Sequence, residues 1–327
     1  MVILTVLLVM TFILGLAFLV CYQSMIAESY VRYLGIKNVS AQNVARTIRG
    51  VEMNAKNVFE EVANHLGSPE EVIEALGRKA DFNLDAKGYF AAFVPDYFPE
   101  KGTWFEPYVY QPDGRGFEYK QVGSARHNYT KSPWYVKAKA TRATFWSDPY
   151  YYYDGTNLSG HYCTFVKPIY DKAGKFVCVC GADMSFAWMK IELEWGDETS
   201  RNNSLLNRHH PFSDFSYYTI LLDKEGTCVA HPQDKAVTIT DKAVLKDLAN
   251  KKNGVADMYI DGELCTLYYG PVDYVDWALA IVVPKQDILR PFLPVAVVFL
   301  FAWVVGLVLV WLALRRIKCA DEDEKVD

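Results

Sequence analysis

Aromatic residues are concentrated in one stretch of the chain. Between Tyr89 and Tyr153 there are 11 Tyr, 3 Trp and 6 Phe, so 20 of the 48 aromatic residues fall within 65 positions. That is more than the core of one small lobe needs, because a buried tyrosine hydroxyl requires a hydrogen-bond partner. We therefore expect some of these rings to line a cavity, where their faces would attract a small cationic group.

A carboxylate is the second group that such a site requires. Asp183 follows the apolar run Val177-Cys178-Val179-Cys180-Gly181, which is typical of a strand. Alternation along that strand places Asp183 on the same face as Val177 and Val179. An ammonium group bound there would make a charge-assisted hydrogen bond with the carboxylate. The residue types predict a site for a small polar molecule, an amine or an amino-acid-like metabolite.

The elements around these residues alternate between short strands and short helices. Aromatic and β-branched runs predict strands, and the turn residues Asp171–Lys175 and Asp261-Gly262 predict hairpins between four of them. We therefore expect an α+β fold of two PAS-like lobes with antiparallel sheets. The predicted strands are 89–94, 104–110, 161–170, 176–183, 217–223, 227–231, 255–260, 263–269 and 277–283, and the predicted short helices are 133–144 and 241–252.

One long helix is predicted over residues 22–66, ahead of both lobes. Its apolar residues recur at steps of three and four, and Ser68 and Pro69 then begin a new helix as N-cap and first helical residue. The stripe has two readings, packing against its own domain or a seam between two copies in a homodimer. The stripe residues are Val44, Ile48, Val51, Ala55, Val58, Val62 and Leu66.

Both ends of the chain are apolar enough to cross a bilayer. Val2–Cys21 contains 20 residues without a charge and Pro291–Leu314 contains 24, while a spanning helix needs about 20. A cleaved signal peptide is the alternative for the first run, but no basic residue precedes it and no cleavage site follows it. Arg315, Arg316 and Lys318 directly follow the second run, which predicts a cytoplasmic tail. Two spans then place both termini in the cytoplasm and the intervening domain outside.

These patterns divide the chain into seven predicted parts. They are a first transmembrane helix (1–21), the long extracytoplasmic helix (22–66), a membrane-distal lobe (67–196), a polar inter-lobe connection (197–214), a membrane-proximal lobe (215–289), a second transmembrane helix (290–314) and a short cytoplasmic tail (315–327).

Composition and motifs exclude several classes of function. The net charge of −5 without a basic block argues against a nucleic-acid partner. The chain has no nucleophile elbow, phosphate loop or metalloprotease motif, so no enzyme activity, catalytic residue or cofactor is predicted. Cys178 and Cys180 have no second cysteine or histidine pair at suitable spacing, so no metal site is predicted.

Several stretches, taken in order, match a known family. They are Lys131-Ser132-Pro133-Trp134-Tyr135, Trp146-Ser147-Asp148-Pro149-Tyr150, Lys167-Pro168-Ile169-Tyr170-Asp171, Gly181-Ala182-Asp183-Met184-Ser185, Leu222–Gly226 with Ala230-His231-Pro232, and Trp277-Ala278-Leu279 with Val283-Pro284. In their order and spacing, residues 22–289 resemble the double Cache sensor domain of bacterial transmembrane receptors. This resemblance implies a receptor in the bacterial inner membrane that binds a small molecule in its distal lobe.

The resemblance also implies particular site residues. Trp134, Tyr135, Tyr150 and Asp183 stand at ligand-binding positions of the family, His127 stands where an aromatic residue is common, and Asp154 matches an acidic position just past the tyrosine. Family members that bind amino acids have an arginine two residues before the tryptophan, where this chain has Ser132. Without that guanidinium, the bidentate clamp for a ligand carboxylate is lost. An amine, or another small polar metabolite, therefore fits the remaining residues.

Two functional hypotheses follow from these observations. In the first, the chain is a membrane-anchored extracytoplasmic sensor that signals across the membrane, through a cytoplasmic or membrane partner, or as the input part of a larger sensor phosphatase or kinase. In the second, its lobes form a protein-interaction or adaptor module without a small-molecule ligand, and Trp134 and Tyr135 only pack a helix against the sheet.

Overall fold

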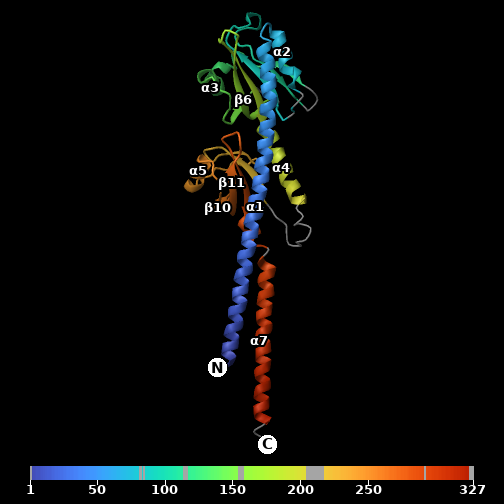
Figure 1. Ribbon diagram of the computed structural model, residues 1–327, viewed down its shortest axis with the longest axis vertical. Helices are drawn as coiled ribbons and strands as arrows, with labels where there is room; N and C mark the ends of the chain where they lie inside the picture. The colour runs from blue at the N-terminus through green and yellow to red at the C-terminus, as the bar shows by residue number, and fades with distance from the viewer. Residues whose placement is uncertain are drawn as a thin grey trace.

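A single helix, α1 (Val2–Asn64), runs past both lobes and continues beyond them (Figure 1). The computed structural model describes residues 2–80, 83, 85–112, 117–153, 158–203, 217–290 and 292–323. The predicted stripe is buried within the chain from Val44 to Val62, while Leu66 lies just past the helix end. It packs against the sheets of its own chain, because α1 contacts β6 and β7 of one sheet and β11 and β12 of the other.

The membrane-distal lobe is built on a seven-stranded antiparallel sheet of order β3-β2-β1-β7-β6-β4, with β5 also paired to β6. The long central hairpin joins β6 and β7 across the predicted turn, where the Asp171 carboxylate accepts hydrogen bonds from the backbone of Ala173 and Lys175. The strands are β1 (Gly88–Phe93), β2 (Pro107–Tyr110), β3 (Glu118–Gln121), β4 (Phe145–Trp146), β5 (Tyr150–Tyr152), β6 (Gly160–Tyr170) and β7 (Phe176–Ser185).

The second lobe is built on a five-stranded antiparallel sheet of order β10-β11-β12-β8-β9. Its β10–β11 hairpin turns at Asp261 and Gly262, which both have positive φ, as a two-residue type I′ turn requires. The strands are β8 (Tyr218–Leu222), β9 (Cys228–Ala230), β10 (Gly254–Ile260), β11 (Glu263–Pro271) and β12 (Ala278–Pro284).

Short helices cover the sheets or lie next to their ends. The N-cap of α2 is Ser68, as predicted, with its hydroxyl accepting the Glu71 N–H at 3.3 Å. The helices are α2 (Pro69–Arg78), α3 (Pro133–Thr141), α4 (Phe186–Asn203), α5 (Lys242–Ala249), α6 (Lys285–Leu289) and α7 (Phe292–Asp323), with 3-10 turns at Pro99–Lys101 and Tyr129–Lys131.

The core has one continuous part and two local parts. The continuous part lies between α1 and one face of each sheet, and it includes Ala182 and Met184 of β7. The opposite face of the second sheet holds a purely aliphatic and aromatic cluster under α5. The opposite face of the first sheet holds Phe90, Val166 and Val179 together with polar groups under α3.

The junction between the lobes differs from the predicted polar connection at residues 197–214. Helix α4 continues to Asn203, and residues 204–216 lie outside the described residues. Asp197 is buried and accepts hydrogen bonds from the Thr219 N–H at 2.8 Å and the Thr219 hydroxyl at 2.6 Å. Asp197 therefore links α4 to β8. Composition alone could not show this, because an aspartate in a polar stretch is equally typical of a linker.

Two helices within the described residues, α1 and α7, contain stretches long and apolar enough to cross a membrane. Their apolar parts lie side by side: Phe18 contacts Phe299, and the Trp303 indole N–H donates to the Thr11 hydroxyl at 3.1 Å. Both chain ends lie at the same end of the molecule, away from the two lobes (Figure 1).

Candidate functional site

A cavity of about 500 Å³ lies on the face of the first sheet that points away from α1. Helix α3 and the segment from β4 to β5 cover it, and the strands β1, β2 and β7 form its floor. Such a volume suits a small molecule. Nine aromatic residues are in its lining: Phe90, Tyr108, Trp134, Phe145, Tyr150, Tyr151, Tyr152, Tyr153 and Tyr162.

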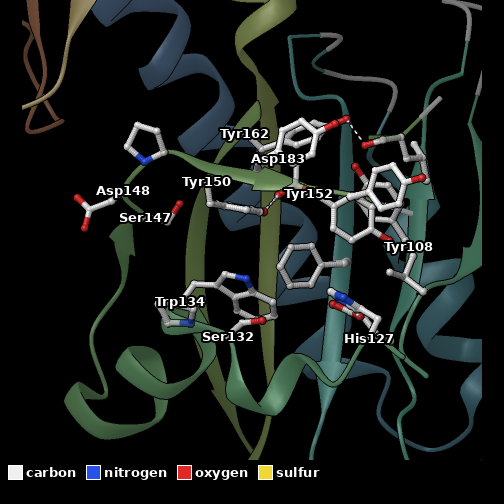
Figure 2. A pocket seen from close by; sticks show the side chains of 18 of the residues that line it. Tyr108, His127, Ser132, Trp134, Ser147, Asp148, Tyr150, Tyr152, Tyr162 and Asp183 are labelled. Carbon is white, nitrogen blue, oxygen red and sulfur yellow. Dashed lines mark hydrogen bonds and ion pairs between the residues drawn. The ribbon is translucent and has the colours of Figure 1, made fainter. Parts of the chain in front are cut away.

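Asp183 lies in the floor of this cavity and is 9% exposed (Figure 2). Its strand β7 is paired on both sides, with Gly88 of β1 and Thr164 of β6 opposite the aspartate. The Thr164 hydroxyl donates to Oδ1 at 2.6 Å and the Tyr150 hydroxyl donates to the same oxygen at 3.3 Å. The prediction that Asp183 shares a face with Val179 agrees with this position, but Val177 packs in the core shared with α1, because the strand register shifts between Ile169 and Tyr170 opposite it.

Burial raises the pKa of Asp183 to about 6, although hydrogen bonds from Thr164, Tyr108 and Tyr150 oppose the shift. The same desolvation raises the pKa of the Tyr108 and Tyr150 hydroxyls well above their ordinary value, so both remain proton donors. The ionised aspartate is therefore poorly neutralised by the protein itself. A ligand ammonium would supply the missing counter-charge.

A second acid, which we did not predict, lines the same cavity. Glu106 is 3% exposed, and its Oε2 atom is buried without a hydrogen bond. His127 Nε2 lies 3.3 Å from that oxygen, and the His127 ring meets the edge of Tyr152. Burial raises the pKa of Glu106, and the contact with His127 opposes that shift. The available sequence signal was an acidic residue between Phe105 and Pro107 in an otherwise apolar stretch.

The two neighbours at the start of α3 have different positions. Trp134 lines the cavity, and its ring lies 5.0 Å from Phe90. Tyr135 is buried beside Tyr129 and Phe176 and is not part of the lining. Successive helical residues point about 100° apart, so one of the two turns away from any cavity that the other faces.

The tyrosine run confirms the predicted alternation. Tyr150 and Tyr152 are half-buried and pack on the cavity side, whereas Tyr151 is 57% and Tyr153 is 74% exposed at the rim. Asp154, the weaker acidic candidate, lies outside the described residues.

The described lining contains no arginine. Ser132 lies in the lining, at the position where amino-acid-binding family members have their arginine. Lys137, also in the lining, is solvent-exposed and its Nζ lies 4.3 Å from the centre of the Phe145 ring. The buried charges of the described cavity are therefore the carboxylates of Asp183 and Glu106, with His127 as the adjacent titratable base.

Comparisons with known proteins agree with this architecture. Residues 72–190 match the family described as methyl-accepting chemotaxis protein-like, first PDC sensor domain. The search among curated proteins gave no match.

Three solved structures with the same fold are distant in sequence. The extracellular domain of the candidate histidine kinase soHK1S-Z6 is 22% identical, with a TM-score of 0.62 over 82% of this chain and 98% of that chain. The periplasmic sensory domain of the Campylobacter jejuni chemoreceptor Tlp1 is 14% identical, with a TM-score of 0.60 over 81% and 99%. The ligand-binding domain of the Pseudomonas aeruginosa amino acid chemoreceptor PctB, in complex with L-Gln, is 19% identical, with a TM-score of 0.54 over 83% and 97%.

The matched segment and the shared fold confirm the predicted resemblance to double Cache sensor domains. Residues 72–190 are thus similar to a first PDC sensor domain, and the whole chain combines a PAS-like distal lobe, a second α/β lobe and two apolar helices.

Proposed function

We propose that the protein is a two-pass receptor of the bacterial inner membrane whose distal lobe binds a small amine outside the cytoplasm. The observation that carries this proposal is a buried carboxylate, Asp183, in the floor of an aromatic cavity whose described lining has no arginine. Ring faces and a carboxylate are the two groups that recognise an ammonium ion. A ligand carboxylate would meet no arginine in the described lining, where Lys137 is solvent-exposed.

The proposed orientation places both termini in the cytoplasm. The basic residues Arg315 and Arg316 follow the second span, and cytoplasmic flanks are enriched in such residues. The ends of α1 and α7 lie at the same end of the molecule, as this topology requires (Figure 1). A membrane or cytoplasmic partner would then receive the signal, and a second copy could pair along the face of α1 that its own lobes leave exposed.

One strand would couple the cavity to the membrane. Asp183 of β7 faces the cavity, while its neighbours Ala182 and Met184 face the core shared with α1. A ligand that draws in the Asp183 region would therefore alter the packing of β7 against α1, which continues directly into the first span. Such a ligand shifts the receptor between two states only by its difference in affinity for them.

The test is a thermal-shift screen of the purified full chain in detergent against amines, amino acids and organic acids. Amines are expected to stabilise the protein, by about 2.7 kcal/mol at a hundredfold excess over the dissociation constant. Asp183→Ala and Trp134→Ala should each abolish the shift. Tyr259→Ala is the matched control, since Tyr259 is 75% exposed on the other lobe.

Two outcomes would reject the proposal. If Asp183→Ala and Trp134→Ala respond to amines like the parent, the cavity is not the site. If no small molecule of any class stabilises the chain, the adaptor hypothesis becomes the better one.

A further inference from the structure

The second buried acid gives the cavity a carboxylate at each of two ends. Glu106 precedes β2 and Asp183 lies on β7, with the single strand β1 between them. The sheet register puts Asp183 opposite Gly88 and Tyr108 opposite Phe90 on that shared strand. Continuing the register, Glu106 stands near Ala92, four residues along β1 from Gly88. The two Cα atoms are then roughly 16 Å apart, given strand spacings of about 4.8 Å and rises of about 3.4 Å.

Both side chains line the one cavity. The ring of Phe90 occupies the floor between the two ends, and Tyr108 stands beside it on β2. The charge of Glu106 contributes to the raised pKa of Asp183, which places the two acids within electrostatic reach of each other. One apolar floor with an acid at each end is the complement of a molecule with an apolar middle and a cation at each end.

Glu106 faces the His127 imidazole at its end of the cavity. Its Oε2 atom is buried and lies 3.3 Å from His127 Nε2, and the imidazole carries a charge only when protonated. Half-buried His127 contacts both Glu106 and Tyr152, which packs on the cavity side. An ammonium group could therefore reach the carboxylate beside the imidazole. A buried carboxylate gains more from such a partner than an exposed one does, because water no longer competes.

We propose that the ligand is an aliphatic diamine, with one ammonium group at Asp183 and the other at Glu106. This inference rests on the proposed function, because it takes the same cavity as an amine site and adds a second anchor to it. Phe90 and Trp134 would cover the methylene chain, whose length must match the distance between the two carboxylates.

The experiment compares matched amines on the full chain in detergent by isothermal titration calorimetry. Butylamine and diaminobutane have the same carbon chain and differ in one amino group. The parent protein should bind the diamine at least about tenfold more tightly, the effect of one additional charge-assisted hydrogen bond. In the series diaminopropane, diaminobutane, diaminopentane and diaminohexane, affinity should pass through a maximum.

The variant Glu106→Gln should lower diamine affinity to the level of the monoamine and leave monoamine affinity within about twofold. Asp183→Asn should weaken both ligands. Glu106→Asp keeps the charge on a shorter side chain, so it should retain the diamine preference and move the optimum toward the longer diamines. The thermal midpoint of each variant without ligand shows whether it is folded.

The results separate this inference from the proposed function. If monoamine and diamine bind equally, or if the diamine preference survives in folded Glu106→Gln, the second anchor is wrong and the amine site stands. If neither amine binds the parent, the amine site fails and the inference fails with it.

Discussion

The two lobes share one layered design but differ on the face that points away from α1. In the membrane-proximal sheet, the central strand β12 sends Ala278, Ala280 and Val282 to that face, and aliphatic residues of α5 and its flanking loops fill the space above them. In the distal sheet, the central strand β7 sends Val179 and Asp183 there, and the space above remains a cavity of about 500 Å³.

The difference shows what separates a structural face from a binding face. An apolar face closes, since each methyl group gains by excluding water. A face with buried acids stays open, since a side chain packed onto it would leave the charge without a partner. Thr164 and Tyr150 satisfy Asp183 in part, and the remaining charge is available to a ligand. The second lobe has an apolar core on both faces of its sheet.

The largest effect is expected when an acid is placed on the apolar face of the second sheet, the face that points away from α1. Ala280 is fully buried and lies between Tyr269 of β11 and Ile220 of β8. Ala280→Asp should destabilise the protein by roughly 3–5 kcal/mol at neutral pH, because the new carboxylate has neither hydrogen-bond donors nor a cation. Thermal unfolding of the full chain measures the loss.

Ala280→Asn, with a side chain of nearly the same size, is the control for this prediction. The deficit of the aspartate variant relative to the asparagine variant should shrink as the pH falls and the carboxyl group becomes neutral. Equal stability of the two variants at all pH values would mean that packing, not charge, distinguishes the two faces.

The reverse change, removal of the acid from the open face, should stabilise the ligand-free protein. The pKa of Asp183 is raised by burial from 3.8 to about 6, so the folded state prefers the protonated form. That preference contributes stability below about pH 4 and is lost as the pH rises through 6. Asp183→Asn should therefore gain up to about 3 kcal/mol over the parent at pH 7.5 and almost nothing near pH 4.

Thermal unfolding at the two pH values checks this sign. Asp148→Asn is the matched control, since Asp148 lies at the same cavity with a side chain that is 76% exposed. A gain of the same size at both pH values would show that desolvation of the charge is not its cause.

A smaller effect on stability is expected at the helix N-caps, which differ between the two lobes. Asp241 accepts N–H bonds from Ala243 at 2.9 Å and Val244 at 3.0 Å, whereas Ser68 accepts one bond at 3.3 Å. Asp241→Ala should therefore cost about 1–2 kcal/mol and Ser68→Ala about 0.5–1 kcal/mol. Thermal midpoints measured beside exposed Asp273→Ala test this order. A larger loss of stability for Ser68→Ala than for Asp241→Ala would contradict the prediction that Asp241 is the stronger cap.

Local pattern predicted most of the fold. The stripe from Val44 to Val62 lies on the predicted face of α1, because a helix repeats its side-chain direction every 3.6 residues whatever it packs against. The cap at Ser68 and the Asp261-Gly262 turn also form as predicted, since both depend on neighbouring residues alone.

Part of the candidate site was predictable for the same reason. Asp183 faces the cavity because strand alternation separates it from Ala182 and Met184. Trp134 and Tyr150 were found through the resemblance and do line the cavity, as does His127, but Tyr135 does not. A resemblance transfers positions, and the direction of a side chain still depends on the helix that carries it.

Periodicity along the chain determined which side of its own element each residue occupies, because that depends only on backbone geometry. The tertiary structure alone decided which sides meet. It brings Tyr108 of β2, and Glu106 just before β2, into the cavity of Asp183 by placing the single strand β1 between β2 and β7. It also buries the polar residue Asp197, which accepts hydrogen bonds from Thr219 of β8. These contacts depend on the order of the strands in the sheet and on which elements cover each face. Neither can be predicted from the spacing of residues within one element.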